Sequence, residues 1–392
     1  MRDSGIPFLL SATLAQVGVS IAQQGIAVVS FAFRAQLHLS LPQAGGLVSA
    51  TSLGVMVTML LGGSATDRYG PRPILIISAC LAPITALALT FAHAYGLLLL
   101  ALVLVGFSVG AVPIGGARAV FFRFSGPLRG TAMGIRQTGV TIGAALAAAF
   151  LPAYVAAHGP YAPWIFLSAI SALFGLVFAI QVPRFPPTAQ ASPGTPLGRD
   201  THMLIVPAVL GFTFAAGQYG LLTYTVPAEA PLVGLAGAGA LLATAQIGGM
   251  LGRVGFGLLS DRLRTRGAVI SLVSGIGALG ILLVPRLGPG VPYALRLLLY
   301  FVTGAGAVGW NALFLTWAAE RVAPDHAARA LGAIGASIFA GSIVFPPLIG
   351  EAARLQGFSF AWIALGVLLG IASLGALAAG RRGAGSGAPL GN

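Results

Sequence analysis

Charge is scarce in this chain. Charged residues make up 7% of its 392 residues, only eight of them are acidic, and lysine is absent because all 21 basic residues are arginine. A soluble domain of this length needs far more charge to cover its surface. Apolar stretches of twenty or more residues recur along the sequence, and such stretches are typical of membrane-spanning helices. The composition therefore predicts an integral membrane protein.

Other shortages exclude further classes of protein. The one cysteine, Cys80, lies in an apolar segment, so no internal disulfide can form and a metal site is not expected. No Asp or Glu falls in the middle of an apolar stretch, which argues against a proton-driven drug pump. No nucleophile–base pair lies at membrane depth, so we expect neither an enzyme nor a cofactor. The net charge of +13 comes from arginines between apolar stretches, which indicates membrane topology and not nucleic-acid binding.

Breaks at polar, Pro-rich or Arg-bearing stretches divide the chain into twelve predicted helical spans, because lipid leaves non-helical backbone amides without partners. The spans are expected near 6–33, 42–64, 73–93, 95–120, 131–155, 162–182, 202–226, 232–259, 267–285, 292–318, 329–350 and 358–380.

The spans form two groups of six. We expect an N-terminal six-helix bundle at 1–182, a Pro- and Ser-rich cytoplasmic linker at 183–201, a C-terminal six-helix bundle at 202–382 and a disordered tail at 383–392. Arginines are far more frequent in the segments that are cytoplasmic when the N-terminus is inside. The positive-inside rule then places both termini in the cytoplasm. We expect the membrane to be the inner (plasma) membrane.

The two halves repeat one another. The stretch GGSATDRYGPRP at 62–73 returns as FGLLSDRLRTRG at 256–267, so that Asp67 matches Asp261. Gly110-Ala-Val112 matches Gly306-Ala-Val308, and Trp164 matches Trp362. These matches, at offsets of 194 to 198 residues, indicate an internal duplication with a site near mid-membrane between the repeats.

The repeated charged stretch resembles the loop signature of the major facilitator superfamily, G-x-x-x-D-R-x-G-R-R. The resemblance covers essentially the whole chain and implies an all-α fold of twelve helices that works by alternating access. It also implies a cytoplasmic gate, or latch, in which the loop Asp and neighbouring arginines hold the halves together. Alternatively, the arginines only set topology. The candidate gate residues are Asp67, Arg68, Arg72, Arg118, Asp261, Arg262 and Arg266.

Three arginines lie at membrane depth: Arg118, Arg136 and Arg253. A charge there costs roughly 2.5–3.5 kcal/mol on insertion scales, so it is expected to have a role. Arg253 with Gly257 and Asp261 resembles the eighth span of nitrate/nitrite and monocarboxylate porters, where the resemblance implies that the arginine binds the substrate anion. A structural role remains open for each of the three. Met59 replaces the second substrate arginine of the nitrate porters.

Polar side chains on the predicted cavity helices complete the candidate substrate site. The candidates are Arg253, Arg136, Gln137, Gln246, Gln16, Gln23, Gln24, Gln218, Tyr219, Trp310 and Asn311, with Tyr224 as a further aromatic group. The leading hypothesis is a monomeric secondary transporter of a small, carboxylate-type anion, with Arg253 as primary and Arg136 as secondary counter-charge. The coupling is proton symport or anion exchange. The alternative is an efflux transporter of neutral or cationic molecules in which the arginines are structural.

Overall fold

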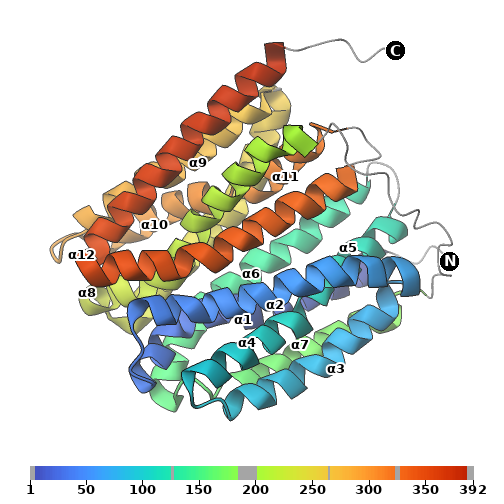
Figure 1. Cartoon of the computed structure of the whole chain (residues 1–392), viewed down its shortest axis with the longest axis horizontal. Coiled ribbons are helices and arrows are strands. Elements are labelled where there is room, and N and C mark those ends of the chain that lie inside the picture. The colour runs from blue at the N-terminus through green and yellow to red at the C-terminus, as the bar shows by residue number, and fades with distance from the viewer. Residues whose placement is uncertain (1–4, 125–127, 184–200, 264, 323–326, 386–392) are drawn as a thin grey trace. The chain divides into compact units, whose positions relative to one another are not determined.

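The computed structural model describes residues 5–124, 128–183, 201–263, 265–322 and 327–385, which are helical and include no strand (Figure 1). In chain order the helices are α1 (Gly5–Gln36), α2 (Leu41–Tyr69), α3 (Pro71–Thr90), α4 (Tyr95–Val109), α5 (Ala111–Arg123), α6 (Leu128–His158), α7 (Trp164–Gln181), α8 (Thr201–Leu263), α9 (Arg266–Leu283), the 3₁₀ turn η2 (Val284–Arg286), α10 (Tyr293–Ala307), α11 (Asn311–Ala319) and α12 (Ala327–Gly385).

Ten segments of the described chain are long and apolar enough to cross a membrane. Two of them, His202–Leu263 and Ala330–Arg381, have 62 and 52 residues, whereas about 20 residues suffice for one crossing. Each contains a non-helical glycine, Gly234 at φ 75° in α8 and Gly357 at φ 82° in α12. Because this left-handed conformation is accessible to glycine at little cost, each long segment consists of two helices that meet at a turn.

Two predicted spans are interrupted. The segment expected at 95–120 is divided into α4 and α5 at Gly110, and the one expected at 292–318 into α10 and α11 after Ala307. The first break precedes Pro113, which has no N–H to donate to the preceding turn. Both breaks fall at the Gly-Ala-Val repeats of the sequence.

The C-terminal tail is partly helical. Helix α12 continues to Gly385, so residues 383–385 are not the disordered segment that the sequence predicts. A glycine costs a helix only about 1 kcal/mol, and the next helix-breaking proline comes at 389. Residues 386–392, and residues 184–200 of the expected linker, lie outside the described part of the chain.

The helices form two compact units. The first comprises Met1–Thr195 with Leu222–Ala243 and Pro346–Glu351, and in it α1 packs most extensively against α6, and α2 against α4. The second comprises Pro196–Leu221, Thr244–Phe345 and Ala352–Asn392, and in it α9 packs against α10. A division into two six-helix bundles at the linker remains a prediction.

Glycines bring helix backbones into direct contact at the same place in each unit. A Cβ on Gly54 of α2 would clash with the Val103 carbonyl of α4, and one on Gly248 of α8 would clash with the Phe301 carbonyl of α10. Gly248 lies 194 residues after Gly54. Small residues allow such close approach, which drives helix association in lipid. The internal duplication is therefore visible in the packing as well as in the sequence.

A larger side chain that pushes α8 and α10 apart should destabilise the second unit. Gly304 of α10 faces the carbonyl of Ala245, so Gly304→Val is expected to lower the free energy of unfolding by at least about 1–3 kcal/mol through overpacking. Thermal denaturation of the purified protein in detergent measures the effect. Gly255→Ala in α8, where a Cβ meets nothing within 4 Å, is the control and should stay at or slightly above the wild-type midpoint. Equal midpoints for both variants would contradict the packing argument.

Candidate functional site

Arg253 of α8 reaches the break between α10 and α11. Its Nε donates a hydrogen bond of 3.3 Å to the carbonyl of Val308. The approach is close because Gly249 faces the Val308 side chain and Gly252 faces the Ala305 carbonyl, leaving no room for a Cβ at either glycine. The guanidinium is partly exposed, and its two terminal nitrogens have no hydrogen-bond or ion-pair partner among the described residues. Arg253 is thus anchored through one nitrogen and open at the other two.

One uncharged polar side chain interacts with this arginine, and two further polar candidates belong to the same unit. Tyr219 is 6% exposed, lies within electrostatic range of Arg253, and has its hydroxyl beside that of Ser342 in α12. The preceding residue, Gln218, is 7% exposed, and its Oε1 has no hydrogen-bond partner among the described residues. Gln246 lies two turns before Arg253 on the same face of α8. It is buried and makes no side-chain hydrogen bond within the described chain.

Arg136 of α6, in the first unit, is buried, and protein groups occupy one of its terminal nitrogens. This Nη2 lies 2.7 Å from Gln16 Oε1 of α1, 3.2 Å from the Val112 carbonyl and 2.9 Å from the Pro113 carbonyl of α5. Gly116 admits the guanidinium to the surface of α5, since an added Cβ would lie 2.9 Å from Nε. The geometry joins α6 to α1 and α5, while Nε is buried and has no hydrogen-bond partner among the described residues.

The two arginines therefore occupy related positions with different capacities. Each donates to carbonyls at or just beyond a helix break, Arg136 next to α4–α5 and Arg253 at α10–α11. Val308 follows the last residue of α10, where carbonyls lack intrahelical donors, whereas Val112 and Pro113 lie in the first turn of α5, where carbonyls already accept intrahelical bonds. Arg136 is 1% exposed, whereas Arg253 retains two accessible donors. Of these two arginines of the described chain, Arg253 is the more exposed.

The remaining substrate candidates divide by exposure. Gln23 is partly exposed, Gln137 is exposed, and Gln24 is buried with an unpaired Oε1. Trp310 is 1% exposed, donates from Nε1 to the Ala307 carbonyl, and packs its ring 5.3 Å from that of Phe214.

These contacts make Trp310 part of the core beneath the break. Asn311, the first residue of α11, is partly exposed. Tyr224 is also buried, and it donates its hydroxyl to the Pro346 carbonyl at 2.5 Å within the first unit.

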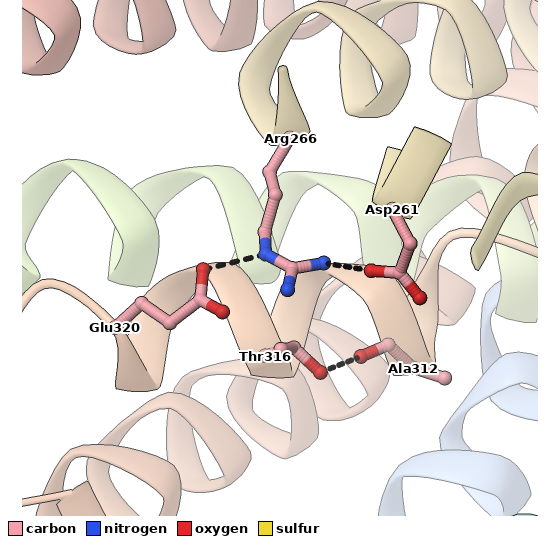
Figure 2. Close-up of polar contacts among 5 residues, drawn as sticks. All are labelled: Asp261, Arg266, Ala312, Thr316 and Glu320. Carbon is pink, nitrogen blue, oxygen red and sulfur yellow. Dashed lines mark hydrogen bonds and ion pairs between the residues drawn. The ribbon is translucent and has the colours of Figure 1, made fainter. Parts of the chain in front are cut away.

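The charged stretch of the second unit forms an ion-pair triad (Figure 2). The Arg266 guanidinium lies between two carboxylates, with Nη1 3.1 Å from Asp261 Oδ1 and Nε 2.6 Å from Glu320 Oε2. These contacts join the end of α8, the start of α9 and the residue after α11. Exposed ion pairs contribute only about 0–1 kcal/mol each, so the triad mainly orients these helix ends. The predicted gate residues Asp261 and Arg266 are therefore in contact, and Glu320 is a partner that the sequence motif did not include.

The first charged stretch is less completely described. Asp67 belongs to α2, but its side chain lies outside the described residues. Arg68 is exposed and stacks over the Tyr69 ring at 5.3 Å. Arg118 stacks over the Phe122 ring at 5.2 Å. Arg72 is partly exposed and Arg262 is exposed.

Ser342 is the site residue that the sequence did not reveal. A serine in an apolar helix gives no signal of its own, because serines are common at helix–helix contacts in membranes. Ser342 becomes a candidate only because α12 places it next to Tyr219.

The comparison with known protein families fits this architecture. The family model described as Major Facilitator Superfamily matches residues 8–346. The chain belongs to this superfamily. It is therefore a membrane transporter of the major facilitator type, as the repeated loop motif predicts.

Its curated relatives include other superfamily members. The chain is 28% identical over 379 residues to the uncharacterized MFS-type transporter Rv2994 of Mycobacterium tuberculosis, covering 90% of this chain and 83% of the relative. It is 26% identical over 337 residues to the probable nitrate/nitrite transporter NarK2 of the same species, covering 83% of each chain. It is 35% identical over 149 residues to the 3-(3-hydroxy-phenyl)propionate transporter of Escherichia coli, covering 38% of this chain and 36% of the relative.

Solved structures agree on the fold. A bacterial homolog of the human lysosomal transporter Spinster, in an inward-facing and unoccupied conformation, superimposes with a TM-score of 0.79 at 17% identity over 100% of both chains. At that identity the likeness shows the major facilitator fold alone.

Proposed function

We propose that this superfamily member is a secondary active transporter that moves a small carboxylate-type anion across the inner membrane by alternating access. The observation that carries the proposal is the Arg253 guanidinium, anchored through Nε and unpaired at both terminal nitrogens. A carboxylate can accept hydrogen bonds from two guanidinium nitrogens at once, and such charge-assisted bonds are about twice as strong as neutral ones. Arg253 is thus the proposed counter-charge for the solute.

The electrostatics of the membrane favour the same conclusion. A charge at membrane depth costs roughly 2.5–3.5 kcal/mol on insertion scales, and a structural arginine offsets this cost through protein partners. Arg136 has such partners, and Arg253 has one long hydrogen bond. A bound anion would supply the compensation that Arg253 lacks, with Tyr219 and Gln246 as its polar neighbours.

The names of two relatives support an anionic solute. One relative is a probable nitrate/nitrite transporter and another transports 3-(3-hydroxy-phenyl)propionate, and both solutes are anions at neutral pH. Nitrate is the weaker guide, because Met59 stands where the resemblance to nitrate porters would place a second arginine. A carboxylate fits a site with a single free guanidinium.

The topology belongs to the same proposal. If the helices on either side of Gly234 and of Gly357 cross separately, the ten candidate segments become the twelve spans of the proposal. The protein would work as a monomer with both termini in the cytoplasm, and its coupling partner would be a proton or a second anion.

Counterflow in proteoliposomes tests the function. Vesicles loaded with an unlabelled carboxylate should accumulate the same labelled carboxylate, whereas protein-free vesicles should not. A panel of lactate, propionate, 3-phenylpropionate, nitrate and a quaternary ammonium compound separates carboxylate transport from the alternatives. Accumulation of the cation alone would refute the anion assignment.

The cytoplasmic latch is a second testable part of the proposal. Asp67 with Arg68 and Arg72 would hold the outward-open state closed on the cytoplasmic side, as the loop signature implies. Asp67→Asn removes the charge with little change in size, so transport should fall severalfold while the amount of folded protein in the membrane stays the same. Uptake rates normalised to purified protein measure this. Wild-type rates for Asp67→Asn would refute the latch.

A further inference from the structure

The first unit contains an apolar cavity between α2, α3 and α4. Its volume is about 150 Å³, and its walls include Leu61 and Ala65 of α2, Ile77 of α3 and Phe107 of α4. Cavities of this size with apolar walls stay dry and bind apolar ligands. The cavity is not part of the candidate substrate site, because Arg253 belongs to the second unit.

The hydroxyl groups in the described wall of the cavity already have hydrogen-bond acceptors. Thr58 donates to the Phe107 carbonyl at 2.7 Å. Ser78 donates to the Ser108 carbonyl, and the Ser108 hydroxyl donates to the Val105 carbonyl at 2.8 Å. A buried water molecule needs two to four polar partners, and an empty cavity forfeits the contacts of the side chains that line it. An apolar occupant is therefore favoured over both water and empty space.

The rim of the cavity indicates where this occupant comes from. Leu61, Ile77 and Phe107 are 59%, 54% and 38% exposed, and they lie in or next to segments that are long and apolar enough to cross a membrane. An exposed side chain at membrane depth meets either lipid or a water-filled passage, and an apolar rim favours lipid. The cavity thus opens where the hydrocarbon chains of the bilayer can enter it.

A basic side chain lies beyond the cavity on the same face of α2. Thr58, Leu61, Ala65 and Arg68 follow one another at intervals of three or four residues, which places them along one side of the helix. Arg68 is exposed, and it lies about 4.5 Å of helix rise beyond Ala65. An arginine forms strong, charge-assisted hydrogen bonds with phosphate oxygens. A phospholipid with one chain in the cavity can therefore place its phosphate at Arg68.

We propose that this cavity binds one acyl chain of a membrane phospholipid, whose phosphate contacts Arg68. The site is additional to the proposed function and does not depend on which solute is transported. Ala65→Leu adds three carbon atoms to a side chain of the cavity wall and should exclude the acyl chain. Because the leucine fills space that is otherwise empty, the protein without lipid should be as stable as wild type or more stable.

Lipid-dependent thermal denaturation of the purified full-length protein tests the proposal. Protein in dodecylmaltoside is titrated with dioleoylphosphatidylglycerol, and native mass spectrometry counts the lipids that remain bound. The detergent is present throughout, so its own tail contributes equally to every measurement. The lipid should raise the wild-type midpoint, and one molecule should stay bound. In Ala65→Leu the lipid concentration for half of this rise should increase about tenfold or more.

Matched variants decide between a specific site and general lipid contact. Ala149→Leu makes the same substitution at an exposed alanine of α6 and should respond to lipid as wild type does. Ala111→Val fills the cavity from α5 if Ala65→Leu does not fold. Arg68→Gln should weaken lipid binding severalfold.

The contrary outcomes are equally specific. Equal lipid dependence in wild type and in both cavity-filling variants would overturn the acyl-chain site. Unchanged lipid binding in Arg68→Gln would overturn the phosphate contact. Either result leaves the proposed function standing, because the measurement involves no transported solute.

Discussion

Arg253→Gln is expected to lower the transport efficiency for the carboxylate substrate by about 100-fold or more. The substitution removes the charge that compensates the anion, and losing one partner of a desolvated pair costs about 3–5 kcal/mol, of which about 2.7 kcal/mol corresponds to 100-fold. The change should appear mainly in KM if Arg253 binds the anion in its resting site. Initial rates of proteoliposome counterflow at several substrate concentrations give both kcat and KM.

Two further arginine variants make the result specific. Arg253→Lys keeps the charge but loses both the Nε bond to Val308 and the planar pair of donors, so its efficiency should lie between those of wild type and Arg253→Gln. Arg286→Gln removes an exposed arginine of η2 and should transport at the wild-type rate. Arg253→Gln protein that transports as well as wild type would exclude Arg253 from the site.

Arg136→Gln should act on stability. The shorter side chain cannot reach all three acceptors, so Gln16 and the carbonyls of Val112 and Pro113 lose a charged donor inside the first unit. We expect the free energy of unfolding to fall by about 2–4 kcal/mol, as for a broken buried polar network. Thermal denaturation of the detergent-purified protein, monitored by size-exclusion chromatography, measures the loss.

A double-mutant cycle distinguishes structure from substrate binding at this position. Gln16→Leu alone should destabilise the protein, and the double variant should lose less than the sum of the two single losses because the residues share one network. A folded Arg136→Gln variant with the wild-type midpoint and weakened anion binding would instead restore Arg136 as a substrate ligand, the role that the sequence suggested.

The glycine contacts show which features of helix packing a repeated sequence pattern can and cannot predict. The duplication was recognisable from the charged loops, Gly-Ala-Val repeats and tryptophans. Of these, the second charged loop falls at ion pairs and the Gly-Ala-Val repeats fall at helix breaks. The contacts of Gly54 and Gly248 with facing carbonyls could not be identified beforehand. The chain has 56 glycines, and nothing in the sequence distinguishes those that face a carbonyl of another helix. Helix packing selects the few that matter.

The two intramembrane arginines illustrate the limit more directly. Both were candidates in the sequence, Arg253 as the primary and Arg136 as the secondary counter-charge, because each lies in an apolar helix. Their partners are carbonyls on other helices, Val112 and Pro113 for Arg136 and Val308 for Arg253. Every residue has a carbonyl, so no sequence pattern marks those that accept a hydrogen bond from an arginine.

The sequence alone determined that the chain crosses a membrane, that it is helical and duplicated, and that it carries the superfamily motif. These properties depend on composition, on the sequence repeat and on the spacing of residues within short motifs, all of which can be read directly from the sequence. Only the tertiary structure decided which arginine is committed to protein and which has free donors, and that the oxygen of Gln218 is unpaired. Hydrogen bonding and burial depend on atoms that are distant in the chain, and folding alone brings those atoms together.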